Sequence, residues 1–214
     1  MRKSNVLRYR LVCLTSAFLL FALITGCGAL DSVLKGSSGA LNGVFMDSPV
    51  GGLNYATPTQ KGVTGADGVF KYQAGETVTF SVGSVKIGSA PGKPVVTPLD
   101  LFPDAKGPSD QRVVNVAVFL QTLDQDGNAV NGILIDEKTA SYVSKYGAET
   151  NFNKPLRGAN SFSFDEGFRS VMAELNNVDA FGSTPRAIKP PFVAQKHLEA
   201  SIAELKKKET PDKK

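Results

Sequence analysis

The sequence predicts an α+β protein, in which an N-terminal antiparallel β-sandwich-like module precedes a helical C-terminal part. Residues 41–100 are rich in Val, Thr, Phe, Tyr and Gly, and short apolar runs there are separated by turn-forming residues. In residues 101–208 the apolar side chains recur instead with helical spacing. A separate apolar run precedes both parts, within residues 1–26.

The first 26 residues have the order of a secretory signal peptide, which is removed from the mature protein. Four basic residues precede an apolar run at residues 11–24, and the sequence ITGC follows at residues 24–27. The run of about 14 residues is shorter than the roughly 20 that a membrane-spanning helix needs. We therefore expect export and cleavage.

The sequence ITGC is similar to the lipobox of bacterial lipoproteins. The resemblance implies that the Cys27 thiol receives a diacylglyceryl group as a thioether, that the chain is cleaved before Cys27, and that the freed amine is acylated with a fatty acid such as palmitate. These chains would anchor the protein to a membrane. Gly28 follows in place of the aspartate that favours inner-membrane retention, so the resemblance implies the outer membrane. The side that the protein faces stays open. Residues 27–40 contain Gly and Ser and would form a flexible, lipidated tether.

The remaining chain is neutral and lacks thiols. The full chain has 24 Lys and Arg and 20 Asp and Glu, and removal of the four basic residues of the signal segment leaves 20 of each. This balance argues against a nucleic-acid partner. The two cysteines are Cys13, in the signal segment, and Cys27, so the domain itself has none for a disulfide or a zinc site.

Five strands are expected in the β-rich module, and turn-forming residues separate them. Alternation is clearest in the sequence VTFSV at residues 78–82. The expected strands span residues 41–46, 53–57, 68–72, 77–82 and 84–87.

Several motifs of this module resemble transthyretin-like sandwiches of the carboxypeptidase regulatory type. GVFMDSPV at residues 43–50 is followed by GVT at 62–64, DGVF at 67–70 and GETV at 75–78. The resemblance implies a sandwich fold, although the segment after Ile87 does not complete one in an obvious way. The longer stretch from Phe45 to Ile135 is similar to proteobacterial lipoproteins of no settled activity.

Four helices are expected after residue 105. The first is capped by Ser109 or Asp110 and ends near residue 123, and its apolar residues predict burial on more than one side. The second spans residues 136–146 and ends at Gly147. The third begins at Ser163, which has capping-box spacing to Glu166 and places Phe164 on an apolar stripe. The last follows residues 190–191 (PP), and residues 209–214 form a disordered tail.

The clearest candidate site is a calcium loop after the first helix. Asp124, Asp126 and Asn128 alternate as oxygen ligands do in the first half of an EF-hand loop. The second half departs from that pattern, because Ala129 replaces the glycine and Ile135 replaces the bidentate glutamate. Asn131 or a backbone carbonyl would have to complete a site. The alternative is a polar turn that ends the helix.

Catalytic patterns are scarce, and we expect no enzyme. His197 is the only histidine and is expected on a solvated helix surface. The chain lacks a G-x-S-x-G sequence. Helix capping accounts for the carboxylates of residues 165–166.

Three functions remain after these exclusions. The leading one is a non-enzymatic envelope binding or scaffolding module, lipid-anchored at the outer membrane, with an envelope protein or glycan as partner. The second is a calcium-stabilised, adhesin-like surface protein. The third is a hydrolase whose site lacks a recognisable motif, and this function requires convergent polar groups in a pocket.

Overall fold

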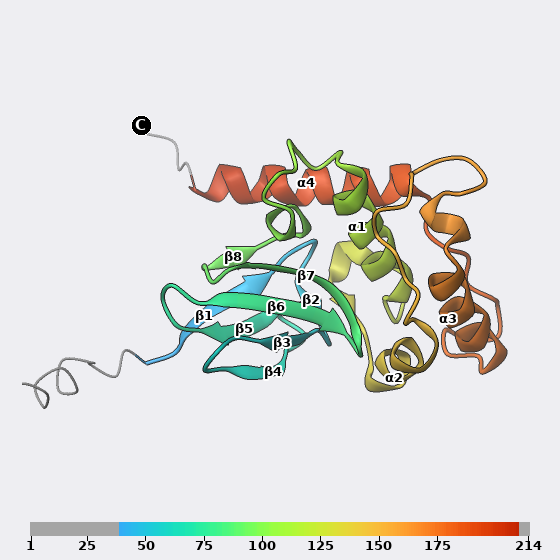
Figure 1. Ribbon diagram of the computed structural model, residues 1–214, viewed down its shortest axis with the longest axis horizontal. Helices are drawn as coiled ribbons and strands as arrows, with labels where there is room; N and C mark the ends of the chain where they lie inside the picture. The colour runs from blue at the N-terminus through green and yellow to red at the C-terminus, as the bar shows by residue number, and fades with distance from the viewer. Residues whose placement is uncertain (1–38, 210–214) are drawn as a thin grey trace, which may run out of the picture. The chain divides into compact units, whose positions relative to one another are not determined.

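The computed structural model describes residues 39–209, and these adopt an α+β fold (Figure 1). Most strands lie between residues 41 and 96, and the α-helices follow them, as expected. The predicted signal peptide, Cys27, the tether up to residue 38 and residues 210–214 lie outside the described residues.

The N-terminal part contains two sheets with aromatic side chains between them. The three-stranded sheet has the order β5-β1-β8 and the larger one the order β4-β3-β6-β7. The strands are β1 (Leu41–Phe45), β3 (Asn54–Ala56), β4 (Lys61–Val63), β5 (Val69–Tyr72), β6 (Thr77–Val82), β7 (Val85–Pro91) and β8 (Val95–Val96).

Three buried phenylalanines join the two sheets. Phe80 of β6 packs edge-on against Phe45 and Phe70, with ring centroids 4.8 and 5.1 Å apart. Because Phe45 belongs to β1 and Phe70 to β5, these contacts run between the sheets rather than within one. The sheets therefore pack face to face in a sandwich-like arrangement.

Short strands complete this arrangement in a way that the sequence did not indicate. The predicted strand at residues 84–87 extends to Pro91, and β8 pairs in parallel with β1. Farther along the chain, β9 (Ile133–Leu134) pairs in parallel with β2 (Val50–Gly51). A segment of the helical part thus extends the β-structure, so that the two predicted parts share a sheet.

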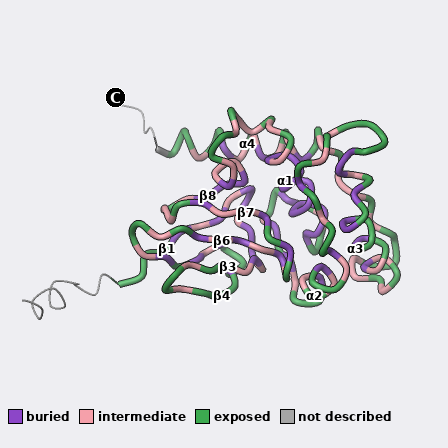
Figure 2. The backbone as a smooth tube through the Cα atoms, viewed as in Figure 1, coloured by how far each residue is buried: buried purple, intermediate pink, exposed green. Residues whose placement is uncertain are grey.

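The first two helices lie where they were predicted, and an aspartate caps each of them. Asp110 caps α1 (Gln111–Leu123) by accepting from the Arg112 amide, and Asp136 caps α2 (Glu137–Tyr146) by accepting from the Thr139 amide. Every residue of α1 from position 113 to 123 is buried, as Figure 2 shows. This confirms the expectation that the helix is covered on more than one side.

The predicted start of the third helix was wrong. Residues Phe162–Phe164 form the 3₁₀ turn η3, and Asp165 caps α3 (Glu166–Asn177) by accepting from the Phe168 amide at 2.9 Å. Asp165 also accepts from the Asn151 amide at 3.2 Å, and this second bond from a distant loop favours it over Ser163. Phe164 is consequently 52% exposed rather than part of the buried stripe.

The last helix, α4 (Pro191–Glu209), packs against α1, whereas α2 packs against α3. Ala194, Leu198 and Ile202 are its buried apolar residues. The remaining regular segments are two 3₁₀ turns, η1 (Pro98–Leu101) and η2 (Ala129–Asn131). The η2 turn lies between α1 and β9, in the loop that holds the predicted calcium ligands.

Candidate functional site

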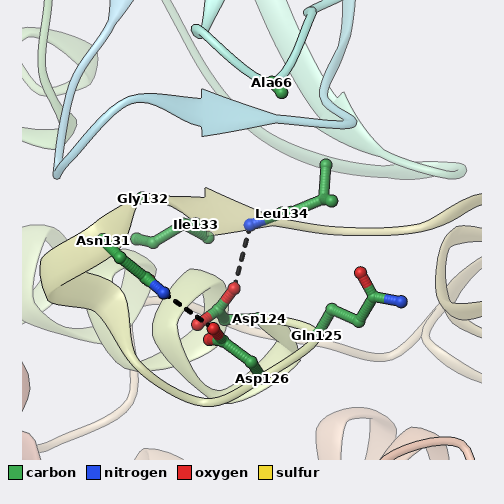
Figure 3. Close-up of a pocket in the computed structure, with 8 residues that line it drawn as sticks. All are labelled: Ala66, Asp124, Gln125, Asp126, Asn131, Gly132, Ile133 and Leu134. Atoms are coloured by element: carbon green, nitrogen blue, oxygen red, sulfur yellow. Dashed lines mark hydrogen bonds between the residues drawn. The ribbon is translucent and has the colours of Figure 1, made fainter.

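The loop from Asp124 to Leu134 borders a cavity of about 240 Å³ (Figure 3). The loop begins where α1 ends, makes the η2 turn and returns as β9. Asp124 and Asp126 line the cavity with Asn131, whereas Asn128 does not. The structure therefore brings two of the three predicted ligands together and places Asn131 beside them.

Asp124 is buried and only partly satisfied. Its side chain is 1% exposed, and its Oδ1 accepts from the Leu134 amide at 2.9 Å. Its Oδ2 has no hydrogen-bond partner among the described residues. Burial raises the pKa of Asp124, and the adjacent Asp126 carboxyl group raises it further.

Asp126 is exposed, and the loop itself holds it in place. Its carboxylate accepts from the Asn128 amide and from Asn131 Nδ2, each at 2.8 Å. The bond from Asn131 is the main cause of its lowered pKa. Asn128 points elsewhere, because its Oδ1 accepts from the Val130 amide at 3.4 Å and caps η2.

Two cations bind the outer carbonyl groups of this loop. Arg186 donates to the carbonyls of Asp124 and Gln125, and Lys189 Nζ donates to that of Gly127 at 3.0 Å. The Arg186 guanidinium also lies 4.0 Å from the centroid of the Phe181 ring. These contacts span about 60 residues of sequence, and no local pattern could have indicated them. Within residues 39–209 no group of three or more His, Cys, Asp or Glu residues could hold a metal ion.

A second buried carboxyl group lies in the turn between β1 and β2. Asp47 is fully buried, and its Oδ2 accepts from Gln121 Nε2 of α1 at 2.9 Å. Burial raises its pKa to about 7, against the lowering effects of Gln121 and Lys189. Asp47 Oδ1 and Gln121 Oε1 lack partners among the described residues, and protonation gives the Asp47 carboxyl group a donor in place of a buried charge.

His197 is not on a fully solvated surface, which corrects the sequence-based expectation. It is half-buried on α4, with Nε2 3.1 Å from the Ser48 hydroxyl oxygen. Desolvation lowers the pKa of His197, although its bond to the Asp47 backbone opposes this shift. Ser201 of α4 donates to the same Asp47 carbonyl at 2.7 Å.

The Ser48–His197 contact joins α4 to the turn at residues 47–48. A neutral imidazole beside a hydroxyl also occurs in Ser–His catalytic pairs, but there a carboxylate orients the second ring nitrogen. The Asp47 group that bonds His197 is its backbone, and its carboxyl group bonds Gln121 instead. The geometry therefore supports a structural clamp between α4 and the β-rich part.

Helix α4 borders a groove of about 370 Å³, which is lined by both polar and apolar side chains. Val130 contributes to this groove, and Asn131–Leu134 line the cavity described above. We call the segment Val130–Leu134, together with these two hollows, the loop face. Val130 is 80% exposed and Leu134 is 40% exposed.

Comparison with family models, with curated proteins and with solved structures gave no match. Among residues 39–209, no helix is long and apolar enough to span a membrane.

Proposed function

We propose that the protein is an outer-membrane lipoprotein whose folded domain is a non-enzymatic binding or scaffolding module. The loop face is the observation that supports this function. It combines two hollows with exposed apolar side chains on one short segment, and the partner is an envelope protein or glycan.

The exposed side chains of the loop face favour recognition of another molecule. Val130 is the most exposed of the large apolar side chains among the described residues. Burying such a side chain against a partner is favourable by about 25 cal/mol per Å² of apolar surface. The polar groups beside it, from Asn131 in the cavity to His197 in the groove, supply directional contacts.

The anchor follows from the N-terminal sequence. A lipidated Cys27 would hold the domain at the membrane, because each buried CH₂ group of its acyl chains contributes about 0.8 kcal/mol. The segment from Cys27 to residue 40 would let the loop face reach its partner.

The test is site-specific photo-crosslinking in intact cells. A photoreactive amino acid replaces Val130, and in a matched control it replaces Val63, a 60% exposed valine on β4. We expect a discrete crosslinked species from position 130 and little from position 63. Crosslinking at position 63 alone would assign binding to the sheet edge instead, and its absence at both positions would argue against a stable partner.

A further inference from the structure

We propose that the cavity beside β9 binds one calcium ion through the side chains of Asp124, Asp126 and Asn131. This cavity is one of the two hollows of the loop face, but calcium binding is measured on the purified protein without a partner. Failure of the calcium test and failure of the crosslinking test can therefore be told apart. It assigns Asn131, rather than Asn128, as the third side chain of the site.

The unpartnered oxygen of Asp124 is the first observation. A buried carboxylate oxygen without a hydrogen bond is costly, because it has lost its water and gained nothing in return. Asp124 is only 1% exposed, and it lines the cavity. Its other oxygen is fixed by the Leu134 amide, so the carboxyl group has one orientation and one oxygen left to bind a ligand.

The position of Asp126 is the second observation. Its carboxyl group interacts with that of Asp124, and Figure 3 shows the two groups next to each other below the β9 strand. Two adjacent carboxylates repel each other unless a positive charge lies between them. A bridging calcium ion supplies that charge and takes oxygen ligands from both residues.

Asn131 supplies the third ligand and sets the chemistry of the site. Its Nδ2 donates to Asp126, which holds the amide group at the cavity wall. To bind the ion the amide has to turn over and exchange this hydrogen bond for ligation through its oxygen, a neutral ligand. Carboxylate and amide oxygens suit a hard cation, and calcium accepts an irregular set of six to eight oxygens. Water would complete the coordination.

Two cationic side chains already bind carbonyl groups of this loop, and their contacts limit the affinity of the site for calcium. Arg186 and Lys189 bind the carbonyls of Asp124, Gln125 and Gly127, so these oxygens are not available to the ion. The two cations also offset the charge of the two carboxylates. We therefore expect weak binding, with a Kd of about 10⁻⁴–10⁻³ M, as in extracellular calcium modules.

The alternative explanation for the carboxyl pair is a shared proton. A proton between Asp124 and Asp126 would remove their repulsion without any metal. Calcium titration near pH 7.5 distinguishes the two cases, because a pair that only shares a proton gives no heat of calcium binding and no stabilisation by calcium.

The experiment uses the full chain, purified in detergent and freed of metal with a chelator. Isothermal titration with calcium chloride should give one site, and saturating calcium should raise the melting temperature by about 2–5 °C. Magnesium should have a smaller effect, because it requires near-octahedral geometry and loses water reluctantly.

Asp126→Asn is the main variant, because Asp126 is exposed and its replacement should leave the fold intact. It should weaken calcium binding at least about tenfold, since calcium affinity depends on the charge of the ligands. Asp104→Asn, which removes an exposed carboxylate paired with Arg112, serves as the control and should bind calcium like the parent protein. Absence of calcium binding by the parent, or equal binding by Asp126→Asn, would overturn the proposal.

Discussion

Asp47 and Asp124 are both almost fully buried, but their surroundings differ in which positive species, a proton or a metal cation, can neutralise the carboxyl group. Asp47 lies against the Gln121 amide, with an unpartnered acceptor on each side chain. A proton suits this arrangement. Asp124 lies against a second carboxyl group in a cavity, where either a proton or a cation would relieve the repulsion.

The raised pKa of Asp47 predicts how stability depends on pH. The pKa of about 7 in the folded protein exceeds the ordinary value of 3.8, so between these pH values the folded state holds a proton that the unfolded state has released. Stability from this group should therefore fall as pH rises from about 4 to 7, by up to about 4 kcal/mol at about 1.4 kcal/mol per pKa unit.

Asp47→Asn should remove this pH dependence, because an amide keeps the acceptor for Gln121 Nε2 and adds a donor without a charge. We expect the variant to be more stable than the parent at pH 8 by about 1–4 kcal/mol and nearly equal at pH 4. Urea unfolding at both pH values measures the difference. The lowered pKa of His197 makes an opposite contribution, in which stability falls as pH drops below about 6.5. Because the parent and the variant both contain His197, this contribution cancels when the two proteins are compared at the same pH.

A variant that is less stable than the parent at pH 8 would show that the carboxylate of Asp47 is needed in its charged form. Asp104→Asn controls for the loss of a negative charge at an exposed position.

Residue-scale contacts were the part least accessible from sequence. Asp124 and Asp126 line one cavity because both lie in one short loop, which is a closeness that the sequence itself displays. The clamp between Ser48 and His197 joins positions 149 residues apart, and the bond between Asp47 and Gln121 spans 74. Neither contact has a local pattern, because the fold alone brings these residues together.

Elements with strong local signals were predicted well. Asp110 caps α1 as expected, and α2 begins one residue after its predicted start at Asp136. The strand β6 has the predicted bounds because its apolar residues alternate over six positions. The strands β2, β8 and β9 contain two residues each, too few to show a period, and their pairing is set by neighbouring segments. The third helix began late because a tertiary bond to Asn151 favoured Asp165 as its cap.

Two phenylalanines near the start of α3 test this correction. Phe168 is fully buried against Phe119 and Phe162, whereas Phe164 is 52% exposed. Phe168→Ala should lower the free energy of unfolding by about 3–5 kcal/mol through lost burial and a residual cavity. Phe164→Ala should change it by less than about 1 kcal/mol.

Urea unfolding of both variants provides the measurement. An equal decrease in the free energy of unfolding for the two variants would mean that Phe164 also packs in the core, as the apolar stripe expected from the sequence implies.

At the scale of the whole described domain, long-range contacts join the β-rich and helical parts. The pair β2–β9, the Asp47–Gln121 bond and the clamp on α4 all meet around the turn at residues 46–50. The same contacts shape the loop face, since one of its hollows lies between this turn and α4. We therefore expect the helical part to be required for binding, although the resemblance to transthyretin-like sandwiches concerned the β-rich module alone.

At the same scale, the proposed location and the proposed function both depend on a lipid anchor at Cys27. Cys27→Ser removes the thiol that would carry the lipid and leaves the residues of the folded domain unchanged. The direct measurement is fractionation of cells that express the parent chain or this variant, with an alkaline wash of the membranes. We expect the parent chain to stay in the membrane fraction and the variant to move to the soluble fraction. A variant that remains in the washed membranes like the parent would show that Cys27 does not carry the anchor.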